Sequence, residues 1–385
     1  MGYRLTRRGI LSGGALGAAA GLAGCVTSSA AAVAEAKGAF PPSAALPLFG
    51  PADGQALLSR NENPYGPSPS ALKAISQSAE KGAFYTNGEA IQTLMKLIAD
   101  RHGVAPEQVV ITTGSGEALS AIALIYGPKG PIVAPRLFWD TTSLYAANLG
   151  LASITRIPLT DGMEIDYAAI EAAITPETGM VQLCNPNNPT GLTTPGSLIR
   201  PAVASMAAKT TVVVDEAYIE LTDDEAAITC MPLVKEGKDV IITRTFSKIY
   251  GMAGIRVGYT ISSAETAARI RATVMSSAPC TSIAAAVGCY NDEAFIAFSK
   301  NRIVEGREMV QATLDTLGLP YLKSQTNFVY FQSGKPANDL QKAMAAERIS
   351  IRGQYMDYEP WSRVSMGKLE DVERFCKTLP KLISA

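Results

Sequence analysis

Short runs of valine and isoleucine recur along the middle of this chain, and each is followed by a segment of helical composition. Two of the clearest are TTVVVDEAY (210–218) and DVIITRTF (239–246), in which apolar residues follow one another without alternating with polar ones. Strands of this kind are covered by helices on both faces, whereas a half-exposed strand alternates. Repeated β–α units also make the sheet between the helices mostly parallel. The sequence therefore predicts an α/β fold.

The chain has 385 residues, which is long enough for two domains. A long helical region is expected from about 283 to 317, and a smaller set of strands and helices follows it. We therefore expect a large domain at 76–285 and a small domain at 286–385. An N-terminal segment, 48–75, is expected to join the small domain.

The first 25 residues have the composition of a targeting segment. Three arginines precede an apolar run, 9–24, that carries no charge and is too short and too rich in Gly and Ala to span a membrane. TRRGIL (6–11) resembles a twin-arginine export signal, and LAGC (22–25) resembles the cleavage box of a lipoprotein, in which Cys25 would become the lipidated first residue. The alternative is a tail in which two arginines are adjacent by chance.

We expect residues 1–25 to act as an export signal, with an Ala- and Ser-rich linker at 26–47 behind it. The predicted location is the periplasm. If Cys25 is lipidated, the chain would instead be anchored to a membrane through that lipid.

The overall composition argues against several classes of function. The net charge is −1 and no long basic or acidic run occurs, so the chain lacks the electrostatic footprint of a nucleic-acid-binding protein. The single histidine, His102, argues against histidine-based metal sites and Ser-His-Asp triads. Six scattered cysteines without a CxxC spacing are typical of buried apolar residues rather than of a zinc site or a disulfide framework. We therefore predict no metal and no nucleic-acid partner.

Unusual residues fall where predicted strands end, which is where ligands bind in open α/β sheets. Gly114-Ser115-Gly116 joins a strand to a helix and could hold an anion on its backbone N–H groups, although many β–α turns also contain Gly and Ser. CNPNNPTG (184–191) follows another strand, and two Asn-Pro pairs plus Thr-Gly are more than a plain proline turn needs. Asp215 closes the strand TTVVVD. An acidic strand end is also typical of nucleotide triphosphatases, but the GxxxxGK[ST] loop of those enzymes is absent from this sequence.

The stretch TFSKIYGMAGIR places Lys248 directly after a buried strand. Burial disfavours the ammonium form and lowers the pKa, which frees a neutral amine that condenses with aldehydes to form a Schiff base. Thr245 and Ser247 offer hydroxyls beside it, and Arg256 offers a planar fork for a phosphate. A phosphorylated aldehyde whose ring nitrogen meets the carboxylate of Asp215 is pyridoxal phosphate, which is the predicted cofactor. The alternative is that Lys248 is an ordinary surface lysine.

This ordered set of motifs resembles the fold-type I aminotransferases. The set comprises GSGEA, NPNNPTG, VVVDEAY, TFSK and an arginine eight residues beyond the lysine. Within that family the chain is similar to the histidinol-phosphate aminotransferase branch, because RNENPYGPSP (60–69) resembles its N-terminal substrate segment and SRVSMG (362–367) its carboxylate-binding segment. The similarity covers about residues 57 to 380. It implies a large domain with a mostly parallel, seven-stranded-type sheet between helices, and a small α/β domain.

The resemblance also implies a role for each residue of the cofactor site. Lys248 would form the Schiff base and later move the proton between substrate and cofactor, while Asp215 would pair with the pyridine nitrogen. Tyr218 and Asn188 would hydrogen-bond the phenolate oxygen of the ring. The cofactor phosphate would be held by Ser115, Gly116, Thr245, Ser247 and Arg256.

The resemblance also implies roles for an aromatic residue at position 138 or 139 and for Tyr85. Family members stack an aromatic ring on the cofactor, and PRLFWDTT (135–142) offers either Trp139 or Phe138 for that place, with core packing as the alternative for both. Tyr85 matches a tyrosine that reaches across a dimer interface to the neighbour's phosphate. The resemblance therefore implies a homodimer with shared active sites.

The substrate side is implied in the same way. Arg363 matches the arginine that binds the α-carboxylate of the substrate, and Arg352 matches a second arginine that faces it. Asn63 and Tyr65 are expected to line the same side. The predicted activity is that of a pyridoxal-phosphate-dependent aminotransferase, which exchanges an amino group between an amino acid and a 2-oxo acid.

Two other interpretations remain at the level of sequence. The same fold also carries decarboxylases, lyases and racemases, and a lipoprotein could keep the fold for binding alone, although the complete set of cofactor residues argues against that. Export bears on the substrate too. Histidinol phosphate is an intermediate of a cytoplasmic pathway, so an exported relative is expected to act on some other amino acid.

Overall fold

A computed structural model of the chain describes residues 50–275 and 277–384. The predicted export signal, 1–25, with its Cys25, and the predicted linker, 26–47, lie outside the described residues. The chain divides into two units, Met1–Asp53 and Gly54–Ala385, and the second contains all the helices and strands described below. Among the described residues, none of the helices has both the length and the apolar character needed to cross a membrane.

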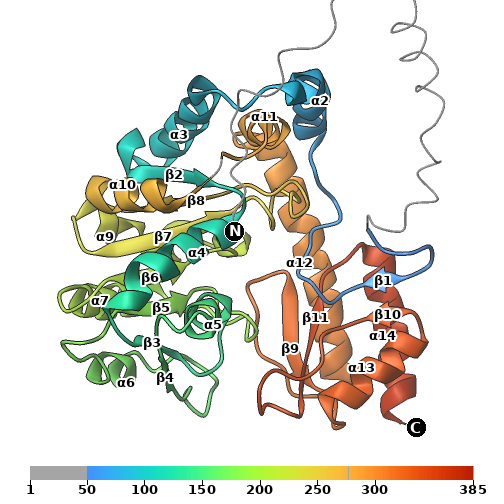
Figure 1. Cartoon of the computed structure of the whole chain (residues 1–385). Coiled ribbons are helices and arrows are strands. Elements are labelled where there is room, and N and C mark those ends of the chain that lie inside the picture. Colours follow the sequence, from blue (N-terminus) through green and yellow to red (C-terminus); the bar gives the residue numbers. More distant parts are fainter. Residues whose placement is uncertain (1–49, 276, 385) are drawn as a thin grey trace, which may run out of the picture. The chain divides into compact units, whose positions relative to one another are not determined.

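A seven-stranded sheet forms the centre of the larger part of the second unit (Figure 1). Its order is β2-β8-β7-β6-β5-β3-β4, and only β8 runs antiparallel to its neighbours. The predicted α/β fold with a mostly parallel sheet is thereby confirmed. The strands are β2 (Val109–Thr112), β3 (Ile132–Pro135), β4 (Ile154–Ile157), β5 (Met180–Cys184), β6 (Val212–Asp215), β7 (Val240–Thr245) and β8 (Gly258–Ile261).

Helices cover both faces of this sheet, which explains why its strands are apolar at every position. Val212 and Val214 belong to one buried cluster, whereas Val213 between them belongs to another. Successive strand residues point to opposite faces, so each face is packed separately. The helices of the first cluster include α3 (Gly88–His102), α6 (Tyr167–Ala172), α7 (Gly196–Ala207) and α9 (Met231–Lys235). The second cluster holds α4 (Ser115–Tyr126), α5 (Thr141–Asn148) and α10 (Ala264–Thr273).

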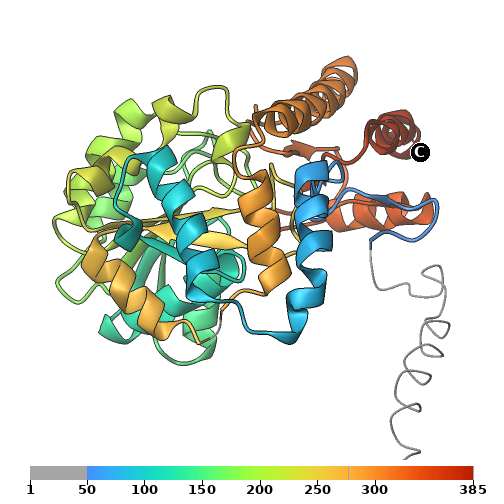
Figure 2. The ribbon, with the colours of Figure 1, turned by 90° about the horizontal axis from the view of Figure 1, so that it is seen from above.

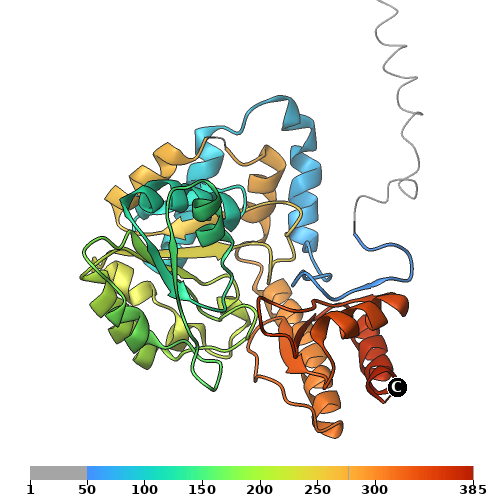
Figure 3. The ribbon, with the colours of Figure 1, turned by 60° about the horizontal axis from the view of Figure 1, so that its bottom comes forward.

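The C-terminal part forms a smaller set of strands and helices, drawn in orange to red beside the sheet in Figure 3. Its β9 (Phe328–Gln332) pairs antiparallel with β11 (Trp361–Ser365). The N-terminal strand β1 (Ala56–Leu57) pairs in parallel with β10 (Ile349–Ser350), so the beginning and the end of the described chain meet here. The helices of this part are α12 (Glu293–Thr316), α13 (Ala337–Ala346) and α14 (Leu369–Ile383).

The region predicted to be helical, about 283–317, consists of two helices. Helix α11 (Cys280–Cys289) ends before Asp292, whose side chain caps α12 by accepting a hydrogen bond from the N–H of Phe295. Such a cap satisfies an N–H group that the first helical turn leaves unpaired. Figure 2 shows α11 lying between α2 (Pro69–Ser78) and α3. The remaining short helices are η3 (Ala79–Ala83), η4 (Pro106–Gln108), η5 (Gly127–Lys129), η6 (Ile219–Leu221) and α8 (Glu225–Ile228).

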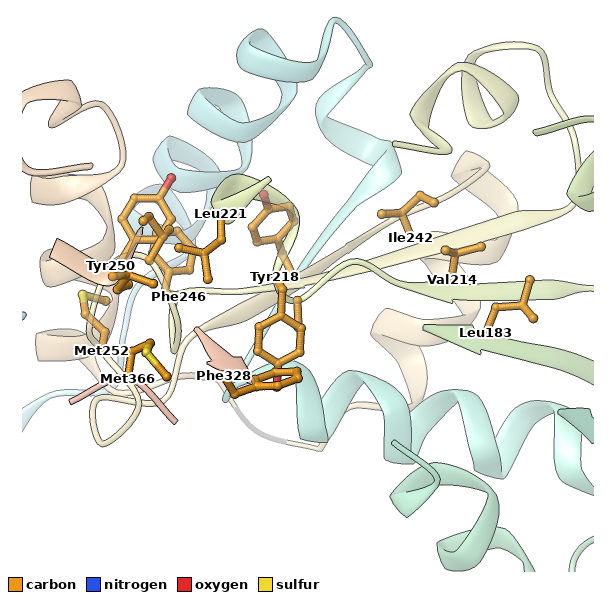
Figure 4. Close-up of a cluster of buried hydrophobic side chains, with 14 of the residues drawn as sticks. Leu183, Val214, Tyr218, Leu221, Ile242, Phe246, Tyr250, Met252, Phe328 and Met366 are labelled. Carbon is orange, nitrogen blue, oxygen red and sulfur yellow. The ribbon is translucent and has the colours of Figure 1, made fainter. Parts of the chain in front are cut away.

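The apolar core extends from the sheet to the loop that carries Lys248 (Figure 4). Phe246 and Tyr250 flank that lysine in the sequence, and their rings pack 4.8 Å apart between centroids. On the other side, Tyr218 meets Phe328 of β9 edge to face at 5.3 Å. Aromatic contacts of this geometry hold a ring in one orientation as well as burying it. The core therefore fixes the residues that surround the ends of β6 and β7.

Candidate active site

The carboxyl ends of six strands lie at one edge of the sheet, because every strand except β8 points the same way. A cavity of about 470 Å³ opens there, as expected for an open α/β sheet. The N-terminal segment, the β6 and β7 ends and the small C-terminal part all contribute to its wall. The lining residues are Ser59, Arg60, Asn61, Ser115, Gly116, Leu119, Ser120, Trp139, Thr141, Thr142, Tyr145, Asn188, Asp215, Ala217, Tyr218, Thr245, Ser247, Lys248, Arg256, Arg352, Tyr355 and Arg363.

Lys248 lies in this cavity, three residues beyond the last residue of β7. Its Nζ donates a hydrogen bond to the carbonyl oxygen of Asn61 at 3.2 Å and lies 5.4 Å from the centre of the Tyr218 ring. Burial and the nearby Arg363 guanidinium lower the pKa of the Lys248 amine to about 8. A substantial fraction of the amine is therefore neutral near physiological pH, which is the form that attacks an aldehyde.

Asp215 is the last residue of β6 and is buried, with 5% of its surface exposed. Burial raises the pKa of its carboxyl to about 6, although the hydroxyl of Thr243, which donates a hydrogen bond to Oδ1 at 2.9 Å, acts in the opposite direction. A buried carboxylate without a cation bonded to it is unfavourable. Asp215 is therefore suited to receive a positively charged ring nitrogen.

The N-terminus of α4 and the side chain of Arg256 form a set of anion-binding donors in the cavity wall, here called the anion cradle. Ser115 and Gly116 begin α4, and the first N–H groups of a helix have no carbonyl within the helix to bond. A Cβ atom built on Gly114, whose φ is +75°, would lie 2.1 Å from Nη2 of Arg256. Only glycine permits the Arg256 guanidinium to lie so close to the helix N-terminus, so the cradle fits a phosphate group.

Two hydroxyls from the end of β7 complete this cradle. The Thr245 hydroxyl donates to Ser247 Oγ at 2.9 Å and also accepts a bond from the N–H of Ser247 at 3.1 Å. Arg256 Nη1 reaches Ser247 Oγ at 3.4 Å. All five predicted phosphate-side residues therefore line one cavity, and the neutral and cationic donors at this end are of the kind that binds phosphate oxygens.

Tyr218 and Asn188 lie between the lysine and the small C-terminal part. Asn188 Nδ2 donates a hydrogen bond to the Tyr218 hydroxyl at 3.3 Å, and Asn188 Oδ1 accepts one from Arg363 Nη1 at 2.6 Å. Burial raises the pKa of the Tyr218 hydroxyl, so the phenol stays protonated at neutral pH. A continuous chain of hydrogen bonds therefore links Arg363 to the reacting end of the cavity.

Arg363 is a buried cation without a carboxylate partner among the residues that the structure describes. Only 3% of its surface is exposed, burial lowers its pKa, and its Nε has no hydrogen-bond partner in the described part of the chain. Nη2 donates to the carbonyl of Ser59 at 2.8 Å. A buried guanidinium is normally compensated by an anion, so this one is suited to a carboxylate or phosphate that enters the cavity.

Arg352 and Arg60 extend this positive region toward solvent. The backbones of Arg352 and Arg363 pair across an isolated antiparallel bridge, and the Arg352 guanidinium stacks 4.9 Å from the centre of the Tyr355 ring. Arg60 is exposed at the cavity wall and forms no ion pair within the described ranges. In all, five cationic side chains and one carboxylate line the cavity.

The structure places Trp139 and Phe138, the two candidates for stacking on the cofactor ring, in different surroundings. Trp139 lines the cavity and remains 42% exposed, whereas Phe138 is buried against Ala134 and Cys184. Trp139 is therefore available to a ring bound in the cavity, and Phe138 packs the core. Tyr145 and Thr142 of α5 stand beside Trp139 in the same wall.

Asn63 and Tyr65 were expected on the substrate side, but neither lines this cavity. Asn63 Nδ2 donates to the carbonyl of Ile249 at 2.9 Å and to Ser299 Oγ at 2.6 Å, and the Tyr65 hydroxyl accepts a bond from the N–H of Leu369. Both side chains thus hold the N-terminal segment against its neighbours. Three neighbouring residues of this segment line the cavity instead, namely Ser59, Arg60 and Asn61. Arg60 and Asn61 belong to the RNENP motif, but neither was predicted as a site residue.

Tyr85 is not in the cavity of its own chain. Its side chain is fully exposed next to Phe84, on the wall of a second hollow of about 530 Å³ between η3, α3 and α11. Two adjacent exposed aromatic residues are unusual on a protein surface.

The residues behind Asp215 form a buried ion pair that the sequence analysis also missed. Arg244 Nη2 lies 2.7 Å from Glu216 Oε2, and Arg244 Nη1 lies 2.5 Å from Glu225 Oε1. Thr229 donates to the same Glu216 carboxylate. No short motif signals this pair, because it depends on the register between β6 and β7.

Together, a lysine of lowered pKa, a buried aspartate at the next strand end and an anion cradle at a helix N-terminus define a pyridoxal-phosphate site on an α/β fold. The sequence pattern of the family described as "Aminotransferase class I and II" matches residues 53–379. The chain belongs to this family.

Individual relatives agree with that assignment. The histidinol-phosphate aminotransferase of Halalkalibacterium halodurans is 32% identical over 319 residues, which cover 81% of this chain and 85% of the relative. A candidate histidinol-phosphate aminotransferase from Erwinia carotovora atroseptica has a similar structure, with a TM-score of 0.82 at 31% identity, covering 88% of this chain and 99% of the other. The histidinol-phosphate aminotransferase of Sinorhizobium meliloti, solved in complex with pyridoxal-5'-phosphate, gives 0.77 at 29% identity over 86% and 91% of the two chains.

These findings confirm the predicted class. The protein is a fold-type I, pyridoxal-phosphate-dependent aminotransferase similar to the histidinol-phosphate aminotransferases. Transamination is therefore favoured over the decarboxylase, lyase, racemase and binding-only interpretations.

Proposed function

We propose that Lys248 carries the cofactor and that the activity is transfer of an amino group from an acidic amino donor to a 2-oxo acid. The observation that supports the first part is the joint presence of Lys248, Asp215 and the Arg256 cradle in one cavity. When bound, pyridoxal phosphate supplies an aldehyde for the lysine amine and a ring that withdraws electrons from the substrate's α-carbon.

Each of the remaining residues has one task in this proposal. Asp215 keeps the ring nitrogen protonated, and Tyr218 with Asn188 donates to the ring's phenolate oxygen. Trp139 stacks on the ring face. The phosphate is held by Ser115, Gly116, Thr245, Ser247 and Arg256.

Lys248 also moves a proton in this proposal. Its free amine lies beside Tyr218 and has a pKa of about 8. A base with a pKa near the working pH can both take a proton from the α-carbon and return it at the neighbouring position. Asn61 holds the free amine at 3.2 Å through its carbonyl oxygen.

The proposed substrate class follows from the charges of the wall. Arg363 would bind the carboxylate of the donor, and Arg352 with Arg60 would bind a second anionic group farther from the reacting carbon. A lining with five cations and one carboxylate favours a donor with two negative groups. Glutamate and aspartate, which each carry two carboxylates, are the donors to test first. Histidinol phosphate, suggested by the names of the relatives, carries a phosphate but no carboxylate and is to be compared with them.

An absorbance spectrum of the full-length protein loaded with pyridoxal phosphate tests this function. We expect a visible band that Lys248→Ala lacks, that an acidic amino donor bleaches and that a 2-oxo acid restores. A band that no amino donor bleaches would contradict transamination. Donors without a second anionic group are expected to act more slowly by about tenfold to a hundredfold, the value of one or two charge-assisted hydrogen bonds.

We further propose that the active unit is a homodimer in which Tyr85 serves the neighbour's phosphate. The exposed pair Phe84 and Tyr85 supports this proposal. Mixing a Lys248→Ala chain with a Tyr85→Ala chain tests it, because a mixed dimer would contain one site with both residues intact. Recovery of activity on mixing is expected, and no recovery, or a monomeric mass, would contradict the proposal.

We also propose that residues 1–25 direct export by the twin-arginine route and that Cys25 is lipidated. The sequence of those residues supports the proposal. Replacing Arg7 and Arg8 by lysine keeps the charge but removes the paired arginines, so the protein is expected to remain inside the cell. Cys25→Ala is expected to be exported without taking up labelled lipid, and export of the double lysine variant would contradict the route.

A further inference from the structure

Asn61 occupies a position that costs free energy locally. Its φ is +56°, in the left-handed region that only glycine, asparagine and aspartate adopt readily, and only 2% of its surface is exposed. A side chain held in such a conformation and buried is normally retained for the contacts that it makes. Those contacts lead to the reacting end of the cavity.

The orientation of the Asn61 amide follows from its bonds to Ser365. The backbone N–H of Asn61 donates to Ser365 Oγ at 3.0 Å, and the Ser365 hydroxyl donates to Asn61 Oδ1 at 2.6 Å. Since Oδ1 accepts from Ser365, the NH₂ group of the amide must face the other way. There it donates to the Tyr218 hydroxyl oxygen at 3.0 Å.

The second donor to Tyr218 is fixed in the same way. Arg363 has only donors, so the Asn188 oxygen faces Arg363 and the Asn188 NH₂ faces Tyr218. The Tyr218 oxygen thus receives two N–H groups, and neither neighbour can accept the phenol's own hydrogen. That hydrogen is left to point at an acceptor in the cavity.

We propose that Asn61 is a positioning residue that, together with Asn188, orients the Tyr218 hydroxyl so that its proton is donated to the ring oxygen of the cofactor. The inference rests on the proposed role of Tyr218. It adds Asn61 of the N-terminal segment to the reaction centre, where its amide would control the direction of the Tyr218 hydroxyl hydrogen. Asn61 acts through Tyr218, and its effect disappears when the phenol hydroxyl is absent.

Asn61→Asp keeps the shape of the side chain but reverses the direction of its hydrogen bond with Tyr218, because a carboxylate accepts where the amide NH₂ donates. A carboxylate at this position accepts from Tyr218 and draws the phenol hydrogen away from the cavity. The negative oxygen of the ring then loses a donor, so the lysine-bound cofactor holds its proton more tightly. We expect the pH midpoint of the visible absorbance change to rise by about one unit, which is the size of one hydrogen bond.

The added charge of Asn61→Asp also acts directly on the lysine, and a double-mutant cycle with Tyr218→Phe separates the two effects. In the Tyr218→Phe background only the direct charge effect remains, so the shift is expected to be smaller by about one unit. Equal shifts in both backgrounds would overturn the proposal. Asn61→Gly, which keeps the left-handed backbone and adds no charge, is expected to give a smaller shift of the same sign.

Asn327→Ala is the matched control for a merely structural role. Asn327 Nδ2 donates to the carbonyl oxygen of Asn61 at 2.9 Å and so holds the same segment without touching Tyr218. It is expected to leave the spectral midpoint unchanged even if the protein unfolds at a lower temperature. A shift equal to that of the Asn61 variants would mean that Asn61 only holds the segment in place.

The outcomes also separate this inference from the proposed function. Absence of a visible band in the wild-type protein with added pyridoxal phosphate would contradict both the proposed function and the role of Asn61. A normal band whose midpoint does not change in Tyr218→Phe would overturn the role of Tyr218, and with it the inference. A midpoint that depends on Tyr218 but not on Asn61 would overturn the inference alone.

Discussion

Asp215 and Glu216 are consecutive in the sequence and both are buried, yet their surroundings are opposite. Glu216 points behind the strand, where Arg244 and Thr229 bond its carboxylate. Asp215 lines the cavity, and within the described residues its carboxylate accepts hydrogen bonds from the Thr243 hydroxyl and a backbone N–H group but has no ion-pair partner, so burial raises the pKa of its carboxyl to about 6. The same pair of strands thus carries compensated charge on one side and uncompensated charge on the other.

The cations repeat this contrast. Arg244 is buried and bonds two carboxylates, whereas Arg363, which is also buried, bonds neutral oxygens only in the part of the chain that the structure describes. Compensated charges hold strands together, while uncompensated ones remain available for a ligand of opposite charge. Substitutions behind the strand should therefore lower the stability of the fold, and substitutions in the cavity should weaken ligand binding.

The largest effect is expected from Lys248→Ala. Loss of the amine that bonds the cofactor and moves the proton should lower the turnover number by about a thousandfold or more. Unfolding of the cofactor-free variant should be no easier than that of wild type, because a desolvated amine is removed. Turnover assays and thermal unfolding check this, with the exposed Lys238→Ala as control. An unstable Lys248→Ala protein would contradict the comparison.

Arg244→Met and Arg363→Met should have opposite consequences. Arg244→Met leaves Glu216 buried without its cation, which should lower the free energy of unfolding by about 3–5 kcal/mol. Arg363→Met leaves no charge unpaired and should lower it by less than about 1 kcal/mol, while raising the KM of the amino donor by about tenfold to a hundredfold. Urea unfolding and steady-state kinetics measure both quantities. Equal losses of stability would mean that Arg363 contributes as much to the fold as the ion-paired Arg244.

The pH dependence of stability sharpens the comparison at Asp215. Its carboxyl binds a proton more tightly when folded than when unfolded, so the stability that it contributes is complete below pH 4 and is lost as the pH rises through about 6. Cofactor-free Asp215→Asn should therefore be more stable than wild type at pH 7 by up to about 3 kcal/mol, the equivalent of two pKa units. The advantage should vanish toward pH 4.

Lys248 should act in the other pH range. Its pKa of about 8 lies below the ordinary value of 10.5, so the folded protein binds fewer protons there and gains stability as the pH rises from about 8 to 10.5. Thermal unfolding of cofactor-free wild type and Lys248→Met across this range measures the gain. A stability difference between the two proteins that does not change with pH would show that the lysine is not desolvated when free.

The contrast also shows what could be predicted from sequence. Lys248, Asp215 and Arg256 stand next to runs of valine and isoleucine or at a fixed spacing from one another, so local patterns were enough to place them at strand ends. The Glu216–Arg244 pair joins residues 28 positions apart through the register of β6 and β7. Asn61 reaches Tyr218 across 157 positions from a left-handed backbone conformation. Neither contact leaves a periodic or compositional signal in the sequence.

Local contacts also decide details that the sequence pattern does not show. The sequence indicated a helical region from about 283 to 317 but not where one helix ends and the next begins, which depends on the capping contact of Asp292. Asn63 and Tyr65 were expected to face the substrate because RNENPYGPSP resembles a substrate segment, yet Arg60 and Asn61 are the residues of that segment that line the cavity. A motif indicates which segment contributes to a site, and the backbone conformation decides which of its side chains does so.

The smallest expected effect concerns two glycines that both have a positive φ, +75° at Gly114 and +69° at Gly150. Gly→Ala should lower the free energy of unfolding at both positions, by about 1–3 kcal/mol at Gly114, whose ψ of 160° is adopted almost only by glycine. A Cβ on Gly150 would meet nothing within 4 Å, whereas one on Gly114 would lie 2.1 Å from Nη2 of Arg256. Because only Gly114→Ala displaces the cradle's guanidinium, only that variant should bind pyridoxal phosphate more weakly, by about tenfold, the value of one charge-assisted hydrogen bond. Equal affinities in a cofactor titration of the two variants would mean that Arg256 does not contribute to phosphate binding.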